Sequence, residues 1–182
     1  MNIDRVIIYA AVVIFFIANQ SLAAGIGAHY QDIPETIDVN AKYIFYMHGS
    51  WLETHDINEP SPHHGKYEYQ KIIDDFVSKN FIVISEKRSE SVKMPRYAKK
   101  IRKKIERLIE EGVSPEKITV FGHSKGGQMT LLTASFVGNE KVNYVVMAGC
   151  GKKGSNFRAG YKKFIEKRAS SLQGRILSLY DS

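Results

Sequence analysis

The sequence contains a single cysteine, Cys150, among its 182 residues. One thiol excludes an intrachain disulfide, although it does not decide the cellular compartment. Internal repeats, collagen-like periodicity and disorder-promoting composition are absent too, since 43% of the residues are hydrophobic and only 14 are glycine and 5 proline. The length is sufficient for one domain with a hydrophobic core.

Acidic residues are the minority, with 19 against 26 lysines and arginines, so the formal net charge is +7. Such a charge can attract an anionic partner. The densest basic run, residues 99–104, shares a predicted helix with apolar residues at helical spacing, Ile101, Ile105 and Leu108. The lysines and arginines then occupy its solvated face. Because no nucleic-acid recognition motif accompanies them, we expect no nucleic-acid partner.

Long apolar runs are missing except at the N-terminus, where residues 6–18 are uninterruptedly apolar. This run is shorter than the ~20 residues that a membrane-spanning helix needs. Ser21 and Ala23 supply small residues at the −3 and −1 positions of a cleavage site. We therefore predict a signal peptide over residues 1–23, a domain over 24–182, a periplasmic or secreted location and no stable membrane span after cleavage. Asp4 is unusual in a signal peptide and leaves an uncleaved anchor open.

Beyond the signal peptide, apolar runs alternate with segments of helical periodicity. Five strands are predicted, over residues 42–48, 81–86, 117–122, 141–149 and 174–181, with four helices over 67–80, 96–112, 127–138 and 156–171. Strands joined through helices are parallel, with right-handed crossovers. The predicted class is α/β, a doubly wound, mostly parallel open sheet of about five strands. Ligands of such sheets bind beyond the carboxyl ends of the strands.

The segment Gly122-His123-Ser124-Lys125-Gly126 lies between a predicted strand and a predicted helix. Gly-x-Ser-x-Gly in this context predicts a nucleophile elbow, in which a strained backbone exposes the serine hydroxyl. Gly122 and Gly126 leave room where strand and helix backbones pass closely. The amide of Lys125, at the helix start, points toward negative charge. The alternative is a glycine-rich turn with an idle serine.

A second turn, His48-Gly49-Ser50, ends the first predicted strand. An acyl-transfer site needs a second amide for the oxyanion, and the Ser50 amide would supply it. Gly49 would let the backbone approach the substrate, and Trp51 would form a wall of the cleft. An ordinary strand-ending turn is the alternative interpretation.

Together, "HGS", "GHSKGG" and the final "LSLYD" resemble the α/β-hydrolase fold over roughly residues 40–182. The resemblance implies Ser124 as nucleophile, Ser50 and Lys125 as oxyanion donors, and Asp181 as the acid that orients a histidine. It further implies a small-molecule acyl substrate and no metal or organic cofactor. Asp181 could instead be a turn residue. No strand is visible before Lys42, where this fold has two more.

The activating histidine is the missing element, because every histidine precedes Ser124. We expect the His123 ring to point away from Ser124 and His48 to bond the loop backbone; the six are His29, His48, His55, His63, His64 and His123. His55, His63 or His64 could reach the serine only by departing from the family order. The simpler interpretation is a chain truncated before the catalytic histidine.

The sequence therefore predicts an exported serine hydrolase of carboxylic esters or related acyl bonds, with its histidine outside this chain. A catalytically inactive, truncated domain that binds a ligand or partner is the alternative. A metal site is a weaker hypothesis, because its candidates match no standard ligand spacing and read better as a polar lid loop: Glu53, His55, Asp56, His63 and His64. Cys150 is expected to be a small buried hydrophobe rather than a reactive thiol.

Overall fold

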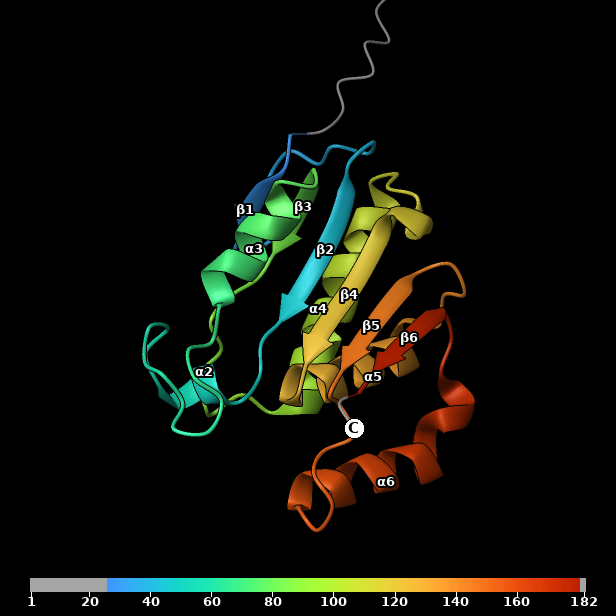
Figure 1. Cartoon of the computed structure of the whole chain (residues 1–182). Helices are drawn as coiled ribbons and strands as arrows, with labels where there is room; N and C mark the ends of the chain where they lie inside the picture. The colour runs from blue at the N-terminus through green and yellow to red at the C-terminus, as the bar shows by residue number, and fades with distance from the viewer. Residues whose placement is uncertain (1–25, 181–182) are drawn as a thin grey trace, which may run out of the picture.

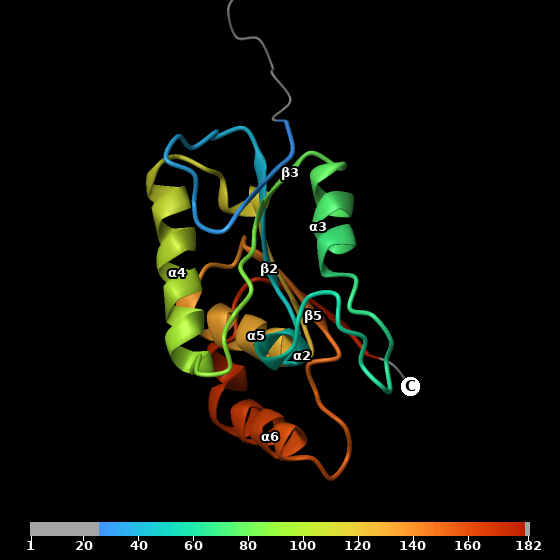
Figure 2. The same ribbon diagram turned by 90° about the vertical axis from the view of Figure 1, so that its left-hand side faces the viewer.

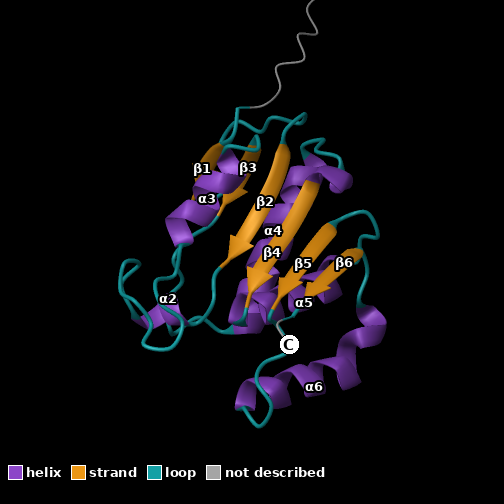
Figure 3. Cartoon of the chain, viewed as in Figure 1, coloured by secondary structure: helices purple, strands orange, loops and turns teal. Residues whose placement is uncertain are grey.

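The computed structural model describes residues 26–180, which form a six-stranded sheet in the order β1-β3-β2-β4-β5-β6. All neighbouring strands are parallel, so their carboxyl ends meet at one edge (Figures 1 and 3). The strands are β1 (Ala28–Tyr30), β2 (Lys42–Met47), β3 (Phe81–Ile84), β4 (Ile118–His123), β5 (Asn143–Met147) and β6 (Arg175–Leu179).

Helices cover both faces of the sheet, which confirms the doubly wound α/β prediction. Figure 2 shows α3 on one face and α4 and α5 on the other. The helices are α2 (Trp51–Thr54), α3 (Tyr69–Val77), α4 (Met94–Glu110), α5 (Lys125–Val137) and α6 (Asn156–Arg168), with 3₁₀ turns at Pro115–Lys117 and Ala169–Ser171. Figure 1 shows α2 and α6 beyond the carboxyl edge of the sheet, α2 near β2 and α6 near β5 and β6.

Two hydrophobic clusters fill the space between the sheet and its helices. Successive residues of β2 point to opposite faces, so Phe45 packs in the larger cluster with α4 and α5, and Ile44 in the smaller one with α3. In the larger cluster, Ile105 and Leu108 of α4 have no exposed surface. These are apolar positions of the basic helix, whose charged residues remain mostly outside, as the periodicity predicts.

The structure corrects the predicted strand count, since β1 precedes Lys42 and makes a sixth strand. Its residues Ala28 to Tyr30 pair with Ile82 to Ile84, and the His29 ring contacts the Ser85 carbonyl at 3.0 Å. Three residues with one polar side chain give no periodic signal, so pairing with β3 decides this strand. The short α2 lies in a segment that was expected to be loop.

The predicted signal peptide, residues 1–23, lies outside the described residues. None of the helices within residues 26–180 has the length and apolar character to cross a bilayer.

Candidate active site

Ser124 occupies the turn between β4 and α5 with a backbone of φ 54° and ψ −116°. A positive φ is uncommon for a residue with a side chain and costs on the order of 1–3 kcal/mol. The conformation is held on both sides, because the Ser124 amide donates to the Met147 carbonyl at 2.8 Å and the Gln128 amide donates to the Ser124 carbonyl at 3.2 Å. The serine is therefore half-buried in a fixed and strained turn.

The glycines flanking Ser124 lie where no side chain would fit. A Cβ on Gly122 would overlap the Gly126 carbonyl and the Thr130 hydroxyl. One on Gly126 would overlap the carbonyl of Met47 at the end of β2. The close approach of strand and helix backbones that the Gly-x-Ser-x-Gly motif requires is thus present.

The turn after β2 lies against this elbow. A Cβ built on Gly49 would be 3.2 Å from His123 Nδ1 and 3.5 Å from Ser124 Cβ. The two segments therefore meet beside Ser124, at the carboxyl ends of β2 and β4. This is the arrangement that an oxyanion site needs, because its donors must surround the atom next to the nucleophile.

Ser50 and Lys125 stand at the starts of α2 and α5, on either side of the point where the two turns meet. Ser50 precedes α2 and Lys125 is the first residue of α5. First-turn amides of a helix have no acceptor within the helix. Neither of these two donates a hydrogen bond to any group within residues 26–180. The parallel sheet, the strained Ser124 elbow after β4 and the turn after β2 occur together in one known architecture. The fold is α/β-hydrolase-like.

Solved structures similar to this hydrolase-like chain share little sequence with it. SOBER1 of Arabidopsis thaliana is 13% identical, with a TM-score of 0.45 over 78% of this chain and 89% of its own. Thermogutta terrifontis esterase 2 with bound butyrate is 12% identical, with a TM-score of 0.40 over 84% and 77%. The α/β hydrolase GrgF of Penicillium sp. sh18 is 16% identical, with a TM-score of 0.39 over 71% and 45%. No family model and no curated protein matches the chain.

His48 is fully buried and bonds backbone groups at the His48-Gly49-Ser50 turn, as the sequence predicts. Its Nε2 accepts the Arg88 amide at 2.8 Å, and its Nδ1–H then donates to the Gly49 carbonyl at 2.7 Å. Burial, followed by the Arg88 charge, lowers the pKa of His48 to about 3. The ring is therefore neutral at ordinary pH and serves as a structural link.

Tyr67 also supports the turn, and the sequence analysis did not single it out. Its hydroxyl accepts the Gly49 amide at 3.0 Å and contacts the Tyr46 hydroxyl at 2.9 Å and His123 Nδ1 at 3.1 Å. The Tyr67 phenol thus joins the His48-Gly49-Ser50 turn to the Ser124 elbow. Burial raises the pKa of Tyr67, so the hydroxyl stays protonated at neutral pH.

A buried ion cluster joins α2 to the start of α5, and its role could not be predicted from the sequence. Glu53 of α2 pairs with Arg88 Nε at 3.4 Å and with the ammonium of Lys125. The Glu53 side chain is 2% exposed and that of Arg88 0%. Arg88 also donates to the His48 carbonyl. Glu53 had been considered only as a metal ligand; here it ties the segment after Ser50 to the residue after Ser124.

The other histidines differ in how firmly they are held. His55 stacks on Trp51 with ring centroids 3.5 Å apart, and Trp51 itself donates to the Glu59 carbonyl at 3.1 Å. The exposed His63 and His64 have centroids 6.4 Å apart. Burial and then the His64 charge lower the pKa of His123. No histidine hydrogen-bonds the Ser124 hydroxyl within the described part of the chain.

The predicted acid, Asp181, lies outside the described residues. The strand before it is placed, because the Leu179 carbonyl accepts the Ala148 amide at 2.8 Å and so fixes the end of β6 beside that of β5. Cys150 is partly buried after β5. Residues 26–180 contain no group of three or more histidine, cysteine, aspartate or glutamate side chains that could bind a metal.

Proposed function

We propose that the protein is an exported serine hydrolase that cleaves carboxylic esters or related acyl bonds through Ser124. The observation that carries the proposal is the strained Ser124 elbow with two unbonded amides beside it. In this reaction the Ser124 oxygen attacks the acyl carbon, and the amides of Ser50 and Lys125 stabilise the negative oxygen of the tetrahedral intermediate.

The reaction needs a histidine that accepts the Ser124 proton and later donates it to the leaving group. We infer that this histidine comes from outside the chain and is oriented by Asp181. The inference is supported by the engagement of His48 and His55, which other groups hold. His64 is the base that we test within the chain, with the neighbouring His63 as its control, because both are exposed residues of the loop between α2 and α3.

The supporting groups would act by keeping the amides in place. Tyr67 holds Gly49, and Glu53 bridges Lys125 and the Arg88 side chain that binds the turn. Donors that are fixed before the reaction need no reorganisation as charge develops. Tyr67 and Glu53 are therefore positioning residues in the proposed mechanism.

Labelling by a fluorophosphonate, whose phosphorus is attacked by an activated serine oxygen with loss of fluoride, tests the nucleophile. Ser124→Ala should abolish labelling, whereas Ser50→Ala should keep it because only the Ser50 amide is used. Ser50→Pro removes that amide and suits the φ of −66° at this position. It should slow ester hydrolysis by about 10²–10³-fold. Labelling that survives in Ser124→Ala would refute the proposal.

The source of the base is tested by the neighbouring histidines. If the base lies outside the chain, His64→Ala and its matched control His63→Ala should label equally slowly, and a histidine-bearing segment joined after Ser182 should accelerate labelling. Loss of labelling in His64→Ala alone would instead identify His64 as the base.

A catalytically inactive domain that binds a ligand is the second candidate. It is favoured by the absence of a histidine bonded to Ser124 within residues 26–180. Under this proposal Ser124 is not labelled in any form of the protein, and Ser124→Ala leaves ligand affinity unchanged.

Export is proposed from residues 1–23 alone. The intact mass of the protein recovered from its host should correspond to a chain that begins after Ala23. A retained Met1 would refute cleavage and leave the anchor interpretation.

A further inference from the structure

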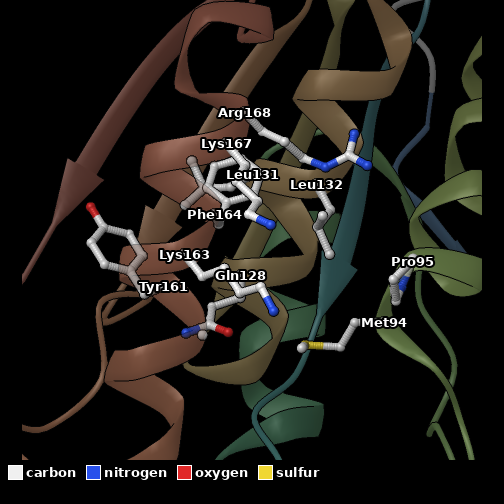
Figure 4. Close-up of a pocket in the computed structure, with 11 residues that line it drawn as sticks. Met94, Pro95, Gln128, Leu131, Leu132, Tyr161, Lys163, Phe164, Lys167 and Arg168 are labelled. Carbon is white, nitrogen blue, oxygen red and sulfur yellow. The ribbon is translucent and has the colours of Figure 1, made fainter.

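A pocket lies between α4, α5 and α6 (Figure 4). One of its lining residues is Gln128, whose amide donates to the Ser124 carbonyl at 3.2 Å, but neither Ser124 nor the elbow glycines line it. Its volume is about 250 Å³ and it is open to solvent on one side. Apolar side chains from all three helices form its walls: Met94 and Pro95 of α4, Leu131 and Leu132 of α5, and Phe164 of α6. A cavity with such walls favours an apolar ligand group over water.

Cations border the same pocket. Lys163, Lys167 and Arg168 line it along one face of α6, and no acidic side chain does so. Within residues 26–180 none of the three forms an ion pair with a carboxylate. Arg168 instead lies over the Phe136 ring of α5, 5.3 Å from its centroid, and Lys99 of α4 lies over the same ring at 5.7 Å. Positive charge therefore gathers at the pocket without neutralisation by the protein.

The size of the pocket limits the ligand. A cavity of about 150 Å³ holds benzene, so six non-hydrogen atoms need roughly 25 Å³ each. At that ratio a volume of about 250 Å³ takes roughly ten non-hydrogen atoms. An eight-carbon carboxylate has this size and combines an alkyl tail with one negative charge.

We propose that the α4–α5–α6 pocket binds a small amphipathic carboxylate of about the length of octanoate. The alkyl tail lies against Leu131, Leu132 and Phe164, and the carboxylate lies at Lys163 and Lys167. Ser124 does not line this pocket, and the proposal does not depend on the proposed hydrolase activity. The ligand is a free anion rather than a membrane surface, because the apolar atoms form a recess and the walls come from three helices.

Calorimetric titration with octanoate, octanol and octylammonium tests the proposal on the full chain. Octanoate should bind at least about five-fold more tightly than octanol, and octylammonium should not bind, because only the anion meets the lysines. Added salt should weaken octanoate binding and leave octanol binding unchanged. Equal binding of octanoate and octanol would overturn the proposal, as would binding to phosphatidylglycerol vesicles without binding to octanoate.

Variants locate the binding. Leu132→Trp fills the pocket and should weaken octanoate binding by about ten-fold or more. Lys167→Glu should weaken it by about five-fold, whereas Lys162→Glu, on α6 outside the pocket, should change it by less than about two-fold. Ser124→Ala should bind as the wild type does. If Leu132→Trp fails to fold by circular dichroism, Gly160→Leu fills the pocket from α6. Unchanged affinity in a folded filling variant would overturn the proposal.

Discussion

A central strand, β2, and an edge strand, β6, differ in how far their residues are buried. In β2 every residue after Lys42 is buried, whereas in β6 all five residues are exposed. Apolar residues account for much of the exposed β6 surface, with Leu177 at 53% and Leu179 at 42%, and Met147 of the neighbouring β5 at 43%. On one face of the sheet, α3 packs against β2, β3 and β4. No described helix covers β5 and β6 on that face (Figure 1).

This difference separates rigid from weakly supported parts of the molecule. The Ser124 elbow, the His48-Gly49-Ser50 turn and the Glu53 ion cluster lie at the ends of β2 and β4 and at the start of α5. The residues around them are densely packed. The helix α6 and the strand β6 have few buried residues, so they should open at lower free energy than the rest. The candidate active site thus depends on the buried half, while the α4–α5–α6 pocket has one wall in the open half.

Truncating one apolar residue in each half should give the largest contrast. Phe45→Ala removes a fully buried ring of β2 and should lower the free energy of unfolding by about 3–5 kcal/mol. Leu177→Ala in β6 should lower it by less than about 1 kcal/mol, because the side chain already contacts solvent. Urea unfolding followed by circular dichroism measures both, and equal effects would contradict the comparison.

Glu53→Gln should have the next largest effect. It leaves the positive charges of Arg88 and Lys125 without their carboxylate, and loss of one partner of a buried pair costs about 3–5 kcal/mol. Glu86→Gln is the control, because the Glu86–Lys100 pair is partly exposed and should contribute less than about 1 kcal/mol. Both are measured by urea unfolding. A Glu53 effect no greater than the control would show that the cluster does not stabilise the turn.

Glycine substitutions compare the elbow with α6. Gly126→Ala would place Cβ against the Met47 backbone and should destabilise the protein by about 2–3 kcal/mol. In Gly160→Ala the nearest atom to the new Cβ is Gln128 Oε1 at 3.9 Å, so the change should stabilise α6 by about 0.5–1 kcal/mol. Thermal unfolding should show opposite shifts of the two melting temperatures. Shifts of the same sign would contradict the difference in backbone packing.

The pH dependence of stability should reveal the buried His48. Because its folded pKa, about 3, lies below the 6.5 of the unfolded chain, the unfolded state binds the proton first as pH falls. The His48 ring is neutral in both states above pH 6.5. As the pH falls from 6.5 to 3, its protonation in the unfolded state should lower the free energy of unfolding. The slope should approach about 1.4 kcal/mol per pH unit.

Urea unfolding at pH 6.5 and pH 5 measures that slope before the carboxyl groups titrate. His48→Asn should reduce it, whereas His63→Asn, on an exposed residue of the α2–α3 loop, should keep it. An unchanged slope in His48→Asn would contradict the assignment of a buried neutral ring.

Most of the fold could be predicted from the sequence because each strand or helix carries its own periodic signal. The apolar runs of β2 to β6 and the amphipathic α4 are examples, as is the elbow around Ser124, whose glycine spacing is a local sequence pattern. Three-residue β1 and four-residue α2 could not be predicted, because elements so short are defined by the neighbours that pair or pack with them.

The sequence by itself determined the parallel α/β architecture and the Gly122-x-Ser124-x-Gly126 turn, because apolar periodicity and glycine spacing are local properties. Only the tertiary structure decided that Tyr67 holds Gly49, that Glu53 joins Arg88 to Lys125, and that the lysines of α6 border an apolar recess. These contacts join residues distant in the chain, and their geometry depends on how the helices pack around the sheet.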